Sequence, residues 1–294
     1  YQALLKDFAK AQQEFFKAYG EASDEDKPKL AKEKYPDFAP KFMEFAEKNA
    51  KDAVAVDALI WVANNPRSRF SGLGEKDPSS AKALDLLLKN HMDSDKLGTV
   101  CQALGFIGSD PSTKAFLSAV LEKSPHKAVQ GDACLALAQG PLYRLRLIEN
   151  MKKEPDAVQQ FTKTFGKEYV EALQKDDADK LLAEGEKYYR QFTDKYSAGM
   201  TTQRLTDLCS SKAYDTDKAS EFLLRALLEK DTRPEVQGAA CLFLGKLLFR
   251  RADDNPDADA KETAKLLKES EELLERAATK YPEIELQRYG TCLL

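Results

Sequence analysis

One pattern of apolar and polar positions occurs twice along the chain and predicts a pair of helices in each place. Ala115–Gln139 (AFLSAVLEKSPHKAVQGDACLALAQ) aligns with Phe222–Lys246 (FLLRALLEKDTRPEVQGAACLFLGK), and close to half of the aligned positions are identical. In the first helix of each copy, apolar residues recur at i, i+3 and i+4, which places them on one helix face. A turn containing proline follows. The second helix is apolar around most of its circumference, so we expect it to be the buried member of the pair.

Fainter copies of this pattern lie elsewhere in the chain. Leu88–Leu104 aligns with Leu121–Leu137, and a second motif recurs at Lys180–Tyr196 and Lys265–Tyr281. A repeat of about 33 residues is the length of a helix pair in solenoid arrays, where each pair buries its apolar face against its neighbours. Alternating patterns typical of strands are nearly absent. The sequence therefore predicts an all-α protein with more than two thirds of its residues in helices. The expected architecture is a right-handed array of helical hairpins, an α-solenoid of HEAT-like or tetratricopeptide-like geometry.

The regular pattern is interrupted near the middle of the chain. We expect N-terminal helical repeats over residues 1–139 and C-terminal helical repeats over residues 177–294, within one continuous array. Between them, residues 140–176 predict an irregular helical connection that begins where Gly140 and Pro141 break the pattern. The lone tryptophan, Trp61, falls on a predicted inner helix, where a core position is expected.

The composition indicates which class of protein this is and which partners it disfavours. The chain has 294 residues, of which 43% are hydrophobic and 32% charged, as is usual for a folded helical protein. A net charge of -4 argues against nucleic acid as the main partner, because phosphate binding needs a basic surface. Apolar runs as long as the 18 or so residues of a membrane span do not occur in the sequence.

Residue patterns that mark catalytic or metal sites are missing. The two histidines, His91 and His126, fall at predicted turns between paired helices, where exposed side chains are expected. Neither belongs to a zinc-protease or nucleophile motif. The acidic turn Asp253–Asp259 resembles a calcium loop only in its alternating oxygen ligands, since it lacks the glycine and the final glutamate. The sequence therefore predicts no cofactor, no metal and no reaction of the chain's own.

The five cysteines divide into two groups. Cys101, Cys134 and Cys241 occupy the same face of the second helix in successive copies, where a buried free cysteine serves as a small apolar residue. Cys209 lies one position off that frame and Cys292 lies near the end of the chain. These two are the candidate reactive thiols. A C-x-x-C pair, which would indicate a dithiol redox centre, does not occur.

A long connection without helical pattern offers a candidate contact surface. Asn64–Ser80 (NNPRSRFSGLGEKDPSS) exceeds the usual length of loops in compact domains, and such loops are typically either functional or disordered. Arg67, Arg69 and Phe70 give this loop two cations and an aromatic ring. They are the candidate partner-binding residues, with a disordered connection as the alternative.

The amino-acid sequence of the repeats resembles that of a known family. The runs YQALLKDFAKAQQEFFKAY, KYPDFAPKFMEFAEKN, DALIWV, LEKSPHKAVQGDACLALAQ and LLERAATKYPEI are similar to the helical region before a thioredoxin-like (redoxin, TlpA-type) domain in exported proteins of planctomycete-type bacteria. The resemblance implies an exported or periplasmic protein whose helices hold or select a partner. The dithiol of that family belongs to the domain after the helices, and this chain ends at GTCLL without it. The resemblance thus implies the non-catalytic portion, a truncated form or a relative that lacks the enzyme domain.

Three functions follow from these observations. The first is a non-catalytic scaffold or binding module for a protein or peptide, including the partner-selecting arm of a thioredoxin-like protein. The second is a redox accessory that works through Cys292 or Cys209 with a thioredoxin-like partner domain. The third is an enzyme whose active site lies between helical repeats without a recognisable motif.

Overall fold

Helices make up nearly all of the regular structure. A computed structural model of the chain describes residues 1–64, 78–107, 111–154, 156–212, 217–254, 259–282, 285–286 and 290–291. Within these residues lie fifteen α-helices, the short 3-10 helix η1 (Ser197–Gly199), and one antiparallel pair of two-residue strands, β1 (Glu285–Leu286) and β2 (Gly290–Thr291). The predictions of an all-α chain and of more than two thirds helix are confirmed.

The helices form two compact units, Tyr1–Leu181 and Leu182–Leu294, which we call unit 1 and unit 2. The boundary falls just beyond the connection predicted at 140–176. The helices of unit 1 are α1 (Gln2–Glu21), α2 (Lys27–Lys34), α3 (Ala39–Lys48), α4 (Ala53–Ala63), α6 (Pro78–Asn90), α7 (Leu97–Ile107), α8 (Pro111–Lys123), α9 (Lys127–Lys153), α10 (Ala157–Phe165) and α11 (Lys167–Gln174).

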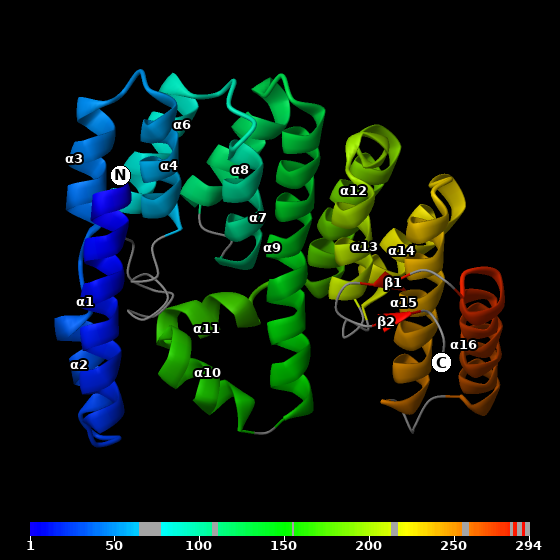
Figure 1. Cartoon of the computed structure of the whole chain (residues 1–294). Helices are drawn as coiled ribbons and strands as arrows, with labels where there is room; N and C mark the ends of the chain where they lie inside the picture. Colours follow the sequence, from blue (N-terminus) through cyan, green and yellow to red (C-terminus); the bar gives the residue numbers. More distant parts are fainter. Residues whose placement is uncertain are drawn as a thin grey trace. The chain divides into compact units, whose positions relative to one another are not determined.

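Helices of unit 1 that are close in the sequence pack side by side (Figure 1). α3 packs on α4, α4 on α6 and α7, α6 on α8, and both α7 and α8 on α9. α4 and the first half of α9 carry mostly buried apolar residues, as predicted for the second helix of each pair. At the N-terminal end, Trp61 stacks on Phe42 with ring centroids 4.0 Å apart and meets the edge of Phe8 at 4.9 Å. Trp61 thus packs against buried aromatic rings but is itself only partly buried, so it lies at the edge of the core and not inside it.

α9 runs without interruption through Gly140 and Pro141, so the break predicted at these residues is wrong. Proline removes one N–H from the helical ladder and costs about 3 kcal/mol relative to alanine in a helix interior. The residues on both sides of it are buried in unit 1, among them Ala138, Leu142 and Leu145. Tertiary burial therefore keeps the segment helical against its local propensity.

α10 and α11 lie beside the C-terminal half of α9 (Figure 1). Leu147 and Ile148 of α9 and Leu173 of α11 form a buried cluster there, and partly buried apolar side chains surround it. Arg144 of α9 also forms an ion pair with Asp176, the second residue after α11. The segment predicted as an irregular connection is therefore packed helical structure that covers the end of α9.

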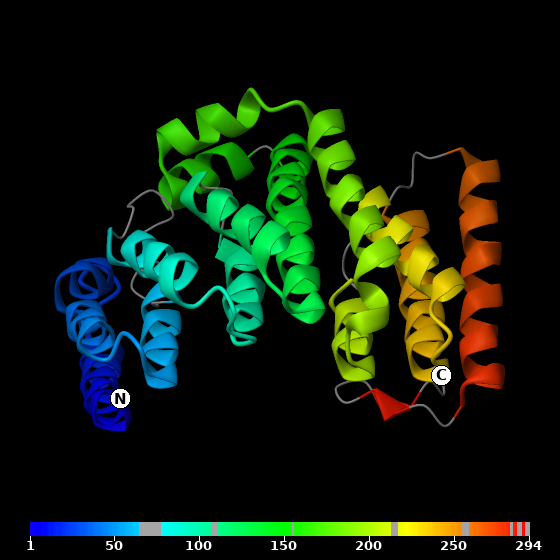
Figure 2. The same ribbon diagram turned by 90° about the horizontal axis from the view of Figure 1, so that it is seen from above.

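α12 (Ala178–Lys195) begins at the end of unit 1 and lies mostly in unit 2. The other helices of unit 2 are α13 (Thr202–Ser211), α14 (Lys218–Lys230), α15 (Pro234–Asp253) and α16 (Ala260–Lys280). α15 is the central helix: α13 and α14 pack against it, and α16 lies along it on the side away from α12 and α13 (Figure 2). Nearly every residue of α15 from Val236 to Leu248 is buried, and Tyr189, Phe192 and Phe243 are fully buried large side chains of this unit.

The two copies of the sequence repeat fold into matching helix pairs. α8 and α14 each span 13 residues and occupy aligned positions at both ends. α9 and α15 also begin at aligned positions, Lys127 and Pro234. The local structure of the repeated stretch is thus the same in both units.

Candidate functional site: an apolar groove between α15 and α16

α15 and α16 run antiparallel and approach closely at one point. Ser270 donates a hydrogen bond of 2.8 Å from its hydroxyl to the backbone oxygen of Gly245, and both residues are buried. A Cβ atom on Gly245 would lie 2.9 Å from Cγ of Leu274 and 3.2 Å from the backbone oxygen of Ser270. Glycine is therefore required for this approach, which fixes the register of the two helices.

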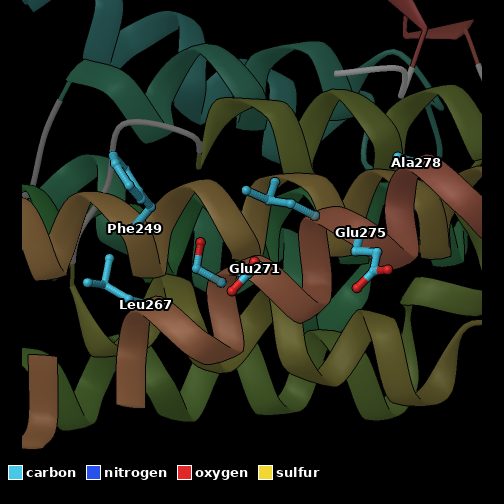
Figure 3. Close-up of a pocket in the computed structure, with 7 residues that line it drawn as sticks. Phe249, Leu267, Glu271, Glu275 and Ala278 are labelled. Carbon is cyan, nitrogen blue, oxygen red and sulfur yellow. The ribbon is translucent and has the colours of Figure 1, made fainter. Parts of the chain in front are cut away.

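Two large apolar side chains stand exposed one helical turn from this contact. Phe249 on α15 is 53% exposed and Leu267 on α16 is 40% exposed. They lie at one end of an open groove of about 680 Å³, which is shown in Figure 3. The lining residues are Phe249, Leu267, Ser270, Glu271, Leu274, Glu275 and Ala278.

The charged residues that line the groove are both acidic. Glu271 and Glu275 are exposed and lie one turn apart on α16 (Figure 3). Among the described residues, neither carboxylate takes part in an ion pair, whereas the neighbouring Glu272 lies 3.9 Å from the ammonium of Lys268. The groove thus combines an apolar floor with two negative charges of its own.

Polar contacts hold α16 in place at its middle and at its C-terminal end. Arg225 of α14 binds Glu269 at 2.5 Å and Glu221 at 2.7 Å, and Arg251 of α15 also pairs with Glu221. Burial alone would raise the pKa of Glu221, but hydrogen bonds from the two arginines bring that pKa below its usual range. At the C-terminal end of α16, the C-cap residue Tyr281 donates a hydrogen bond of 2.7 Å to Gln237 of α15. The groove is therefore preformed between firmly anchored helices.

The partner-binding residues predicted from the sequence, Arg67, Arg69 and Phe70, lie outside the described residues. So does Cys292, one of the two candidate reactive thiols.

The other candidate thiol, Cys209, lies on α13 and is fully buried. Burial raises the pKa of this thiol well above its usual range, and the nearby charge of Asp231 adds to the effect. Both features keep the sulfur protonated and covered, which disfavours thiolate chemistry. Cys101, Cys134 and Cys241 are fully buried among apolar residues, which confirms their predicted use as small core residues.

The expectation of two exposed histidines is wrong for His91. Its ring is buried, and its Nε2 has no hydrogen-bond partner in the described part of the chain. Burial lowers the pKa of this imidazole, while the charge of Asp93 acts in the opposite direction. His126 is the N-cap residue of α9, and its Nε2 lies 2.7 Å from the backbone oxygen of Asp93. The ring of His126 therefore links the turn before α9 to the turn that contains Asp93.

Over the described ranges, no group of three His, Cys, Asp or Glu side chains has a geometry that could hold a metal ion. In the same part of the chain, no helix is long and apolar enough to cross a membrane. No family model, curated protein or solved structure matches the chain. The likeness to helical regions of thioredoxin-like proteins therefore stays a prediction.

Proposed function

We propose that this protein is a non-catalytic helical-repeat scaffold that binds a protein or peptide partner in the groove between α15 and α16. The observation that carries the proposal is the exposure of Phe249 and Leu267 on facing helices, above a hollow lined by Leu274 and Ala278. Large side chains exposed together at a groove are typical of interaction sites, whereas single exposed apolar residues are normal.

An array of helix pairs supports such a role. The matching bounds of α8 with α14, and the matching starts of α9 and α15, favour a HEAT-like or tetratricopeptide-like arrangement in each unit. In such arrays each repeat contacts only its neighbours, and the exposed surfaces of the helices are available to partners. α16 packs mainly on α15, which leaves its groove face open.

The proposed role is recognition without chemistry of the chain's own. The four described cysteines are buried, and the acidic residues of the groove are solvated carboxylates on one helix. If the protein is the helical arm of a thioredoxin-like protein, the groove would select the partner on which the other domain acts.

Selection from an unbiased library tests the proposal. We would pan random linear peptides of about 16 residues against the protein and measure the affinity of the enriched peptides for variants. The Phe249→Ser/Leu267→Ser double variant is expected to bind the peptides at least about tenfold more weakly, because a few large side chains contribute most of the binding energy at an interface.

Phe16→Ser is the matched control for this selection. Phe16 is 47% exposed and lies on α1 in the other unit, so its truncation removes a similar apolar surface away from the groove. Binding to this variant should be unchanged. The proposal fails if the library yields no binder, or if the enriched peptides bind the groove variant as tightly as the parent protein.

A further inference from the structure

We propose that the occupant of the groove is an amphipathic helix of a partner protein, with apolar residues on one face and lysine or arginine beside them. This inference rests on the proposed function and names the class of partner. It draws on a comparison between the two units, on the charge of the groove and on its length.

The two units differ in the exposure of one pair of equivalent positions. Phe249 of α15 and Leu142 of α9 each lie three residues beyond the end of the repeated stretch, at the same offset as the aligned residues. Leu142 is 4% exposed, whereas Phe249 is 53% exposed. The same apolar position is therefore covered in unit 1 and open in unit 2.

Unit 1 shows how apolar side chains of short helices pack on a long helix. α10 and α11 lie along the C-terminal half of α9 and bring apolar side chains against Leu147 and Ile148. Leu142 does not belong to that cluster. The chain thus contains an example of helices that pack on a long helix through apolar side chains, although at other positions than Leu142.

The charge of the groove selects among amphipathic helices. Glu271 and Glu275 are the charged residues that line it, and neither has an ion-pair partner in the described part of the chain. Carboxylates at i and i+4 form a row on one helix face, with neighbouring Cβ atoms about 6 Å apart. A helix with lysine or arginine at the same spacing places a cation opposite each carboxylate, whereas an acidic helix is repelled.

The length of the groove sets the size of the contact. It follows α16 from Leu267 to Ala278, a distance of about 16 Å at 1.5 Å per residue. About three turns of a helix fill that length. A partner helix would place apolar residues at i, i+3 or i+4, and i+7 against Phe249, Leu267 and Leu274, which is the usual helix-in-groove pattern.

A displayed library of helices tests this inference. The library consists of helical peptides of about 14 residues in which the positions of one face vary between apolar and polar residues and the flanking positions vary among Lys, Glu and Gln. We expect selection on the protein to enrich apolar residues at helical spacing, together with lysine over glutamate at the flanks.

Variants of the protein then separate the two parts of the contact. Phe249→Ser should weaken the enriched peptides at least about tenfold. The Glu271→Gln/Glu275→Gln variant should weaken them about three- to tenfold, and added salt should reduce this difference. Glu262→Gln, an exposed change in the first turn of α16, serves as the charge control and should have no effect.

The outcomes distinguish the inference from the proposed function. Enrichment of acidic helices, or of peptides that bind the glutamine variant equally well, would overturn the inference. If random peptides bind in a Phe249-dependent manner but no helix is enriched, the inference fails and the proposed function stands. Failure of both libraries would overturn both, as would sedimentation showing that Phe249 instead mediates association with a second copy of the chain.

Discussion

The guanidinium of Arg233 donates a hydrogen bond of 2.6 Å to the backbone oxygen of Met200, 33 residues earlier in the chain. The aligned residue in unit 1, His126, makes the same contact with Asp93, again across 33 residues. In both units the N-cap residue of the buried helix reaches a carbonyl in the preceding turn. The period of about 33 residues in the sequence thus has a physical counterpart in a contact between successive helix pairs.

Removal of Arg233 should destabilise unit 2. Its guanidinium also binds the buried carboxylate of Asp231, and although burial raises the pKa of that carboxyl, the arginine brings it below its usual range. Arg233→Met would leave the charge of Asp231 without this partner. We expect a loss of about 2 to 3 kcal/mol at neutral pH. Amide hydrogen exchange in α13 and α15 measures it, with α3 and α4 as internal reference.

A double-variant cycle checks the origin of that loss. Asp231→Asn combined with Arg233→Met should cost about 1 kcal/mol less than the sum of the single changes, because the two residues interact directly. Additive effects would show that the pair contributes nothing beyond its separate parts.

His91 should make unit 1 sensitive to acid. Burial lowers the pKa of its imidazole below the value of about 6.5 found in unfolded chains, so the unfolded state binds a proton first as the pH falls. The free energy of unfolding should therefore decrease as the pH drops from about 6.5 toward the pKa of the folded state. His91→Gln should flatten this part of the profile.

Urea unfolding at a series of pH values measures this effect through the fluorescence of Trp61, the lone tryptophan of the chain, which lies in the same unit. His126→Gln is the control, and it should keep the acid sensitivity of the parent protein. A parent profile that is flat between about pH 5 and 7 would contradict the buried neutral imidazole.

Pro141→Ala should stabilise α9. The substitution supplies the missing N–H to the helix and relieves the ring clash, at the cost of some buried apolar surface. We expect a net gain of about 1 to 2 kcal/mol, measured by urea unfolding through Trp61. A loss of stability would mean that the proline ring packs in a way that outweighs its helix penalty.

A side chain at Gly245 should disrupt the contact that shapes the groove. Gly245→Val places carbon atoms against Leu274 and the backbone of Ser270, so we expect a loss of about 2 kcal/mol, detected as faster hydrogen exchange in α16. Gly20→Ala is the control, since nothing lies within 4 Å of a Cβ atom there. That change should leave stability unchanged or raise it by up to about 1 kcal/mol.

Local patterns were sufficient to predict the helix pairs. The apolar spacing in α8, α9, α14 and α15 and the turns between them are properties of a few adjacent residues, and the aligned helices begin where the repeat predicts. Pro141 was misread because propensity ignores the burial around it. His91 was misread because its turn is covered by other parts of unit 1.

The groove could not be predicted from local sequence patterns. Leu142 and Phe249 are both apolar residues at equivalent positions of a helix, and nothing in their local sequence says that the first is covered and the second open. Exposure depends on which segments distant in the sequence pack against each position, and local patterns carry no information about that. The sequence does show that Glu271 and Glu275 are four residues apart on one helix. Two acidic residues at this spacing are common on solvated helix faces, so they do not by themselves predict a binding site.

Hydroxyl-radical footprinting with and without a selected helical peptide tests the central claim most directly. Phe249 and Phe16 are similarly exposed in the free protein, so both should be oxidised, and Phe16 provides the internal reference. Saturating peptide should protect Phe249 and Leu267 from oxidation and leave Phe16 unchanged. Unchanged oxidation of Phe249 while the peptide is bound would show that the groove between α15 and α16 is not the binding site.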